Sequence, residues 1–215
     1  MNQATFLLEA SDELRLLFEA CFVSQRLKAG ETLFDKDELD DRLYVLDQGL
    51  LEVSVYSVSG RKLSLNMLRP GSVFGEIALF DPGLRTAHVA ALEASSLRAI
   101  RQPTLIAAVA SRPHLAVELL SLAGKRMRWM SQQIEDQVFL SPKARLAAKI
   151  LYLCGENRII DMSQAQMADY VGVTREVVSK ILSEWRREGF LAVSRGRIEV
   201  LDVDALQNIQ NSTFF

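Results

Sequence analysis

The chain of 215 residues has little cysteine and histidine, with only Cys21, Cys154, His88 and His114. Two cysteines far apart in the sequence exclude a disulfide scaffold, and they exclude a multi-cysteine zinc site or iron–sulfur cluster built from one chain. Two histidines likewise exclude a histidine-rich metal site. No apolar run approaches the ~20 residues that a membrane span needs, and no basic segment followed by an apolar one indicates a signal peptide. We therefore expect a cytoplasmic protein without metal and without a membrane partner.

Neither sign of charge dominates, since 25 Lys and Arg residues stand against 27 Asp and Glu residues, for a net charge of -2. Any nucleic-acid site must therefore be local. The composition, 49% hydrophobic and 24% charged, is that of a globular protein. The sequence contains no Walker-type loop, no metal cluster and no nucleophile–base constellation, so an enzyme is not expected.

Short apolar runs separated by turn residues fill the first half of the chain, at residues 31–34, 42–46, 50–56, 62–68 and 87–98. Glycines or Pro-Gly pairs lie between these runs, and strands at such spacing predict an all-β sandwich or barrel. Residues 50–56 alternate between apolar and polar, which predicts a half-exposed strand. A short helix is expected before the first strand, at residues 12–21.

The pattern becomes helical over residues 113–138, where apolar residues recur at spacings of four and three. This is the seam of a coiled coil, and the alternative is a helix packed on its own β domain. A helix of this length that links two domains can hardly be covered all along by either, so we expect a homodimer. The seam residues are Ala116, Leu120, Ala123, Met127, Met130 and Ile134.

The last third of the chain has the pattern of a helix-turn-helix. Ser163 and Gln166 have the spacing of a capping box, Gly172 marks a tight turn, and Thr174 is expected to cap a second helix over residues 175–188. Trp185 is expected in the core. Ser141 and Pro142 predict the start of a shorter helix upstream, which ends near residue 153.

The second helix of such a motif enters the major groove, and Arg or Lys side chains there donate to guanine while Glu accepts from cytosine. Residues 193–201 resemble a β-hairpin, or wing, that contacts phosphates. Residues 174–197 carry six basic and three acidic side chains. Although a charged helix face is often merely solvated, the combination favours DNA binding. The residues expected at the DNA are Ser163, Gln164, Thr174, Arg175, Glu176, Ser179, Lys180, Arg195 and Arg197.

A second motif lies in the first half, where Gly75-Glu76-Ile77-Ala78 is followed by Arg85-Thr86. The first four residues can begin a short helix whose free N–H groups favour an anion. Arg85 can give a bidentate fork to a phosphate, and Glu76 can accept from a sugar hydroxyl. The alternative is a structural Glu76–Arg85 salt bridge.

Residues 75–87 resemble the phosphate-binding cassette of cyclic-nucleotide-binding domains. Together with the helix-turn-helix, they make the chain similar to the cyclic AMP receptor protein/FNR family of bacterial transcription regulators over residues 10–205. The resemblance implies an α+β protein in three parts. These are a jelly-roll-like β-roll that binds a cyclic nucleotide (residues 1–112), a dimerisation helix (113–138) and a winged helix-turn-helix that binds DNA (139–215).

The resemblance also implies the ligand site. In the family the cassette arginine and the next hydroxyl bind the cyclic phosphate, the glutamate takes the ribose 2′-hydroxyl, and backbone amides complete the pocket. Two residues of the dimer helix, Thr then Ser in the cyclic AMP receptor, contact adenine; here they are Met130 and Ser131, which leaves the purine open. Cyclic AMP is the expected effector and cyclic GMP the alternative. The implied ligand residues are Gly75, Glu76, Ile77, Ala78, Arg85, Thr86, Met130 and Ser131.

The sequence thus predicts a homodimeric regulator in which the cyclic nucleotide repositions the recognition helices, with double-stranded DNA and RNA polymerase as partners. In the recognition helix Lys180 replaces the family's second arginine and loses a bidentate fork. Two alternatives stay open. One keeps DNA binding but responds to another signal or to none, and the other is a cyclic-nucleotide-binding subunit that acts on a protein partner.

Overall fold

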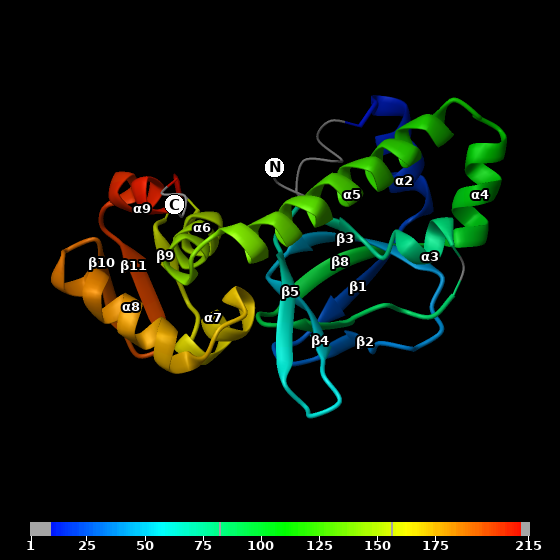
Figure 1. Cartoon of the computed structure of the whole chain (residues 1–215). Helices are drawn as coiled ribbons and strands as arrows, with labels where there is room; N and C mark the ends of the chain where they lie inside the picture. Colours follow the sequence, from blue (N-terminus) through cyan, green and yellow to red (C-terminus); the bar gives the residue numbers. More distant parts are fainter. Residues whose placement is uncertain (1–9, 82, 156, 212–215) are drawn as a thin grey trace. The chain divides into compact units, whose positions relative to one another are not determined.

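The computed structural model describes residues 10–81, 83–155 and 157–211. The chain forms two compact units, residues 1–61 with 65–130 and residues 62–64 with 131–215. Antiparallel strands form most of the first unit and helices most of the second (Figure 1). This is the predicted α+β class, with an N-terminal β domain, a long helix and a C-terminal helix-turn-helix.

Two antiparallel sheets form the first unit. One has the strand order β1-β8-β3-β6, and the other has the order β2-β7-β4-β5. The strands of the first sheet are β1 (Val23–Leu27), β3 (Arg42–Gln48), β6 (Val73–Phe74) and β8 (Ser95–Arg101). The strands of the second are β2 (Thr32–Phe34), β4 (Leu51–Tyr56), β5 (Lys62–Leu68) and β7 (His88–Ala91).

Two apolar clusters hold these elements together. One lies between the sheets and includes Phe34, Tyr44, Leu51 and Phe74. The other joins the helices to the outer side of β3 and β8, through residues such as Phe18, Leu43, Leu105 and Leu119. Both faces of β3 are therefore buried, which fixes the position of its first residues against the rest of the domain.

The strand predictions at 31–34, 42–46, 50–56 and 62–68 are confirmed to within two residues. The run at 87–98 is two strands, β7 and β8, which lie in different sheets. The strands β1 and β6 were not predicted, because β1 is mostly polar and β6 has only two residues.

The prediction that residues 50–56 form a half-exposed strand is wrong. Glu52 and Ser54 are buried although they occupy the polar face of β4. Alternation of apolar and polar residues predicts an exposed strand face only where nothing packs on that face, and both faces of β4 are buried.

Among the described residues, the helices of the first unit are α2 (Asp12–Cys21), α3 (Ile77–Phe80), α4 (Gln102–Ala110) and the start of α5 (Leu115–Phe139). The bounds of α2 are those predicted. The long helix begins at Leu115, two residues after the predicted start, because Pro113 and His114 form a turn. Helix α4 was not predicted, since a sequence that is apolar on nearly all sides shows no helical period. Within the described ranges, no helix combines the length and apolarity needed to cross a membrane.

The second unit contains the end of α5 and four further helices with a small sheet of order β10-β11-β9. Its elements are α6 (Pro142–Cys154), β9 (Ile159–Ile160), α7 (Gln164–Val171), α8 (Arg175–Arg187), β10 (Leu191–Ser194), β11 (Arg197–Val200) and α9 (Val203–Asn211).

Local signals in the sequence set the geometry of α7 and α8. Ser163 and Gln166 form the predicted capping box, and Gly172 ends α7 in the left-handed conformation at φ 77°. Thr174 stands at the N-cap of α8 but gives no side-chain bond to the helix backbone. Trp185 is buried, as predicted. These features orient α8, so that its polar side faces solvent.

Candidate ligand pocket and DNA interface

The cassette begins where β6 ends. Gly75 has φ 82°, and a Cβ atom there would come within 2.7 Å of the Arg42 carbonyl oxygen and 2.8 Å of Arg85 Nη1. Only glycine fits this position, because both the backbone angle and the space exclude a side chain. The chain then forms the four-residue helix α3 and turns back to Arg85. Gly75 therefore allows the start of the cassette to pack directly against the Arg85 side chain.

Arg85 points into the domain and its side chain is only 3% exposed. Its Nη2 donates to Asp40 Oδ2 at 2.7 Å and to the Arg42 carbonyl oxygen at 2.6 Å. Its Nη1 donates to the Gly75 carbonyl oxygen at 3.2 Å. The guanidinium carbon lies 4.2 Å from the centre of the Phe34 ring, in the position of a cation–π contact. The guanidinium is thus held by hydrogen bonds within the protein.

Asp40 is the carboxylate of this cluster. Besides Arg85 it accepts from Arg42 Nε at 2.7 Å and from the Tyr44 hydroxyl at 2.8 Å. Burial alone would raise the pKa of Asp40, but the hydrogen bonds from Arg42, Arg85 and Tyr44 outweigh it and lower that pKa. Burial and the Asp40 carboxylate also raise the pKa of Tyr44, which keeps the hydroxyl a donor. Asp40 is therefore ionised and paired with Arg85.

Glu76 is also buried, but it pairs with Arg126 of α5 at 3.2 Å and not with Arg85. Arg126 in turn lies 4.6 Å from the centre of the Trp129 ring. The structural Glu76–Arg85 salt bridge considered from the sequence is absent from the described residues. Glu76 instead connects the cassette to the long helix.

Buried polar atoms without a hydrogen-bond partner remain at this site. They are Glu76 Oε1, Arg85 Nε, and Nε and Nη1 of Arg126. Leaving buried donors and acceptors unsatisfied costs free energy, so each of these atoms calls for a partner. An acceptor beside Arg donors suits a molecule with hydroxyl groups and an anionic phosphate, so these residues fit a cyclic nucleotide.

The other predicted ligand residues differ in position. Ala78 is buried, whereas Ile77 is 42% exposed and Thr86 is exposed. Met130 and Ser131 are both exposed on α5. The ligand-binding roles of these five residues stay predictions.

Sequence reasoning missed Asp40 and Arg126. Asp40 is one of four acidic residues within positions 37–41, and nothing in that run marks it as the buried one. Arg126 precedes the seam residue Met127 on a helix with two other basic side chains, Lys125 and Arg128. In both cases only the tertiary structure selects the residue.

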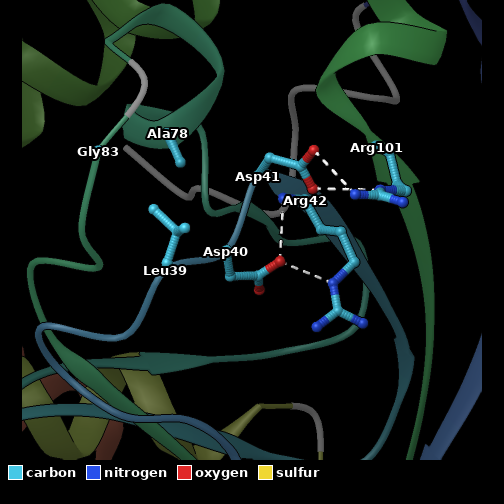
Figure 2. A pocket seen from close by; sticks show the side chains of 7 residues that line it. All are labelled: Leu39, Asp40, Asp41, Arg42, Ala78, Gly83 and Arg101. Atoms are coloured by element: carbon cyan, nitrogen blue, oxygen red, sulfur yellow. Dashed lines mark hydrogen bonds and ion pairs between the residues drawn. The ribbon is translucent and has the colours of Figure 1, made fainter.

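A cavity of about 590 Å³ lies beside the cluster, as Figure 2 shows. Asp41 and Arg101 pair across part of it at 3.4 Å, and Asp40 and Arg42 form another part of its wall. Its lining residues are Leu39, Asp40, Asp41, Arg42, Ala78, Gly83 and Arg101. Asp40 thus contacts Arg85 and also lines this cavity, with 5% of its side chain exposed. No group of three or more potential metal-ligating side chains occurs in the ranges that the structure describes.

The second unit presents a basic surface. Arg175, Lys180, Arg195 and Arg197 are exposed, and among the described residues none of them makes an ion pair with a carboxylate. Glu176 is also exposed, and hydrogen bonds from its own backbone amide and from the Thr174 hydroxyl lower its pKa. Of the other predicted DNA residues, Ser163, Gln164 and Ser179 are partly exposed.

Side-chain contacts tie the end of α5 to this unit. Lys149 of α6 donates to Gln133 Oε1 at 2.7 Å and lies 4.4 Å from the centre of the Tyr170 ring of α7. Burial lowers the pKa of Lys149 to about 8. Arg145 donates to the carbonyl oxygens of Gln137 and Leu140. The last turns of α5 are therefore anchored to α6 and α7.

The long helix α5 has a buried face and an exposed apolar face. Leu115, Leu119 and Leu122 are buried against the domain. The predicted seam lies elsewhere: Leu120, Met127, Met130 and Ile134 are 48–68% exposed, and Ala116 and Ala123 are partly buried. An exposed apolar stripe of this length is typical of an interaction surface.

Comparisons with known proteins agree with both halves of this picture. The family model described as "Cyclic nucleotide-binding domain" matches residues 24–112, and the one described as "Crp-like helix-turn-helix domain" matches residues 144–209. The "CRP-like cAMP-activated global transcriptional regulator" of Mycobacterium tuberculosis is 27% identical over 82% of this chain and 83% of its own length. The "Cyclic AMP receptor protein" of Thermus thermophilus is 28% identical over 84% of each chain. The solved structure of FixK2 from Bradyrhizobium japonicum has the same fold, with a TM-score of 0.79 at 20% identity over 89% of this chain and 98% of its own.

The cassette geometry makes Gly75 testable against a matched glycine. Gly60 has nearly the same φ, 78°, but nothing lies within 4 Å of its would-be Cβ. Both alanine variants bear the cost of a left-handed alanine, ~1 kcal/mol, and only Gly75→Ala adds crowding of ~1–3 kcal/mol. In urea unfolding followed by circular dichroism, Gly75→Ala should lower the midpoint clearly more than Gly60→Ala. Equal midpoints would show that Gly75 is not sterically required.

Proposed function

The chain belongs to the cyclic AMP receptor protein/FNR family of DNA-binding transcription regulators, and from this premise we propose that it is a homodimer whose DNA binding responds to a cyclic nucleotide. The observation that carries the proposal is the buried set of unsatisfied atoms on Glu76 and Arg85. Members of the family regulate transcription and are not enzymes. The effector is proposed to be cyclic AMP, with cyclic GMP as the alternative.

The charge of the pocket suits such an effector. Three arginines, Arg42, Arg85 and Arg126, face two carboxylates, Asp40 and Glu76. The cluster therefore carries one positive charge, and a cyclic phosphodiester carries one negative charge. In the proposed complex Arg85 and the Thr86 hydroxyl hold the phosphate, with the backbones of Gly75, Ile77 and Ala78, and Glu76 accepts from the ribose 2′-hydroxyl. Met130 and Ser131 face the purine.

Coupling to DNA is proposed to run along α5. Arg126 reaches Glu76 from this helix, so a ligand hydroxyl at Glu76 changes a contact that α5 makes. The last turns of the same helix are anchored to α6 and α7 through Lys149 and Arg145. The ligand shifts the equilibrium only as far as it prefers the DNA-competent arrangement. In that arrangement the two recognition helices must lie ~34 Å apart to enter successive major grooves.

The remaining parts of the proposal follow from the family and the surface. The domains are residues 1–112, 113–138 and 139–215. DNA is read by Arg175, Glu176, Ser179 and Lys180 and held by Ser163, Gln164, Thr174, Arg195 and Arg197. RNA polymerase is a further partner, and the protein acts in the cytoplasm.

One observation favours a second candidate function. Asp40 already occupies Arg85, as a built-in anion would in a regulator that responds to another signal or to none. The following experiment separates the two.

Arg85→Lys keeps the charge beside Asp40 but removes the fork. Because hydrogen bonds to charged groups contribute ~1.5–3 kcal/mol, cyclic AMP binding should weaken about 10- to 100-fold in calorimetric titration. DNA binding by the variant should then need correspondingly more nucleotide. The matched control is Arg98→Lys, since Arg98 is also paired with an aspartate, Asp47, but does not belong to the cluster around Arg85. If neither cyclic AMP nor cyclic GMP changes the DNA affinity of the wild type, the second candidate function is supported instead.

The dimer proposal is tested by Met127→Glu. A charge in the apolar seam should convert the dimer into a monomer in sedimentation velocity. Val58→Glu is the control, since Val58 is fully exposed and apolar but lies outside the helix. A wild type that sediments as a monomer over the whole micromolar range would refute the dimer.

The DNA surface is tested with a fragment selected from a random pool by the wild type. Lys180→Ala should lose ~1–3 kcal/mol on that fragment and discriminate less between bases. Arg195→Ala should weaken binding to all sequences alike and reduce the salt dependence by about one phosphate contact. Fluorescence anisotropy at several salt concentrations measures both. If the two variants behaved alike, the assignment of helix to bases and wing to phosphates would be wrong.

A further inference from the structure

The hydrogen atoms of Arg85 are already largely used within the protein. A guanidinium has five N–H groups, of which Nη2 and Nη1 have two each and Nε has one. Both hydrogens of Nη2 are engaged, by Asp40 Oδ2 and by the Arg42 carbonyl oxygen. One hydrogen of Nη1 is engaged by the Gly75 carbonyl oxygen. Only Nε–H and one Nη1–H stay available.

These two hydrogens do not form a fork. A guanidinium grips a phosphate with two parallel N–H groups, either Nε with Nη2 or Nη1 with Nη2. Each arrangement needs a hydrogen on Nη2. A phosphate that binds with both hydrogen bonds must therefore displace Asp40 or the Arg42 carbonyl oxygen. The carbonyl belongs to β3 and is fixed by the sheet, whereas Asp40 is a side chain.

Asp40 keeps other partners when it leaves Arg85. Its Oδ1 accepts from the Arg42 backbone amide at 3.2 Å and from Arg42 Nε at 2.7 Å, and the Tyr44 hydroxyl donates to its Oδ2. Arg42 is itself partly exposed, with 38% of its side chain accessible. Asp40 also lines the cavity, beside Leu39 and Arg42 (Figure 2). Release thus leaves no buried charge without a partner.

We propose that Asp40 is an internal competitor for the phosphate-binding arginine and that it sets the affinity of this pocket for cyclic phosphodiesters. This inference rests on the proposed function, because it assumes that a phosphate binds at Arg85. In the free protein the Asp40 carboxylate takes one of the two Nη2 hydrogens of Arg85. On binding, the phosphate takes an Nη2 hydrogen and Asp40 stays with Arg42 and Tyr44. Asp40 is therefore an affinity-determining residue and makes no contact with the base.

The test is Asp40→Asn, which keeps the shape and the acceptor for Tyr44 but removes the charge that competes with phosphate. Calorimetric titration of the full-length protein with cyclic AMP, and separately with cyclic GMP, should show about tenfold tighter binding than in the wild type for whichever nucleotide binds. The matched control is Asp41→Asn, which removes a neighbouring negative charge that pairs with Arg101 and does not touch Arg85. Its affinity should change by less than about twofold.

The outcomes separate this inference from the proposed function. If the wild type binds a cyclic nucleotide and Asp40→Asn binds it equally or more weakly, Asp40 is not a competitor, although the pocket is real. If Asp41→Asn tightens binding as much as Asp40→Asn, the effect is general electrostatics and the inference also fails. If neither the wild type nor Asp40→Asn binds either nucleotide, both this inference and the proposed function fail. If Asp40→Asn does not fold, Asp40→Ala is used in its place, since it also removes the negative charge. The same outcomes then test the inference.

Discussion

The candidate pocket depends on one constraint, the burial of the Arg85 guanidinium. A charged group removed from water must keep its hydrogen bonds and a counter-charge, or its free energy rises by several kcal/mol. The surrounding structure satisfies both needs: β3 supplies the Arg42 carbonyl oxygen, the end of β6 supplies that of Gly75, and Asp40 supplies the charge. This is why Gly75 must be glycine and why the first residues of β3 have a fixed position.

The same constraint leaves the pocket incomplete in a specific way. Once Nη1 and Nη2 have their partners, Arg85 Nε points to no acceptor, and Glu76 Oε1 receives no hydrogen from Arg126 although the two side chains form an ion pair. A donor, Arg85 Nε, and an acceptor, Glu76 Oε1, are thus left without hydrogen-bond partners in a buried site next to Arg126 of α5. A molecule that offers a phosphate oxygen and a hydroxyl completes both, so the fold is held in a form that such a ligand stabilises.

Much of this could be predicted from the sequence, because short-range rules set it. The capping box at Ser163, the left-handed Gly172 and the helical period of α5 each depend on a few neighbouring residues, and the cassette from Gly75 to Thr86 is a contiguous motif. What failed depends on distant partners. Which elements pack together decides three further features: the burial of Glu52 and Ser54, the burial of Asp40 rather than its three acidic neighbours, and the pairing of Glu76 with Arg126. No periodicity in the sequence encodes these features. Helix α4 was not predicted for another reason, because a uniformly apolar helix shows no amphipathic pattern in the sequence.

Two residues missed by sequence reasoning would divide the work of the proposed regulator between them. Asp40 contacts Arg85 within the β domain, so its competition acts on every arrangement of the protein alike and changes the ligand concentration at which the site fills. A free-energy contribution that is equal in both arrangements does not shift the equilibrium between them. Arg126 is different, because it belongs to α5 and meets Glu76, whose free oxygen is the one that a ligand hydroxyl would satisfy. Only a contact of this second kind can differ between two positions of the helix. The threshold of the response and its amplitude are therefore set by separate side chains, and evolution or design can change the first without losing the second.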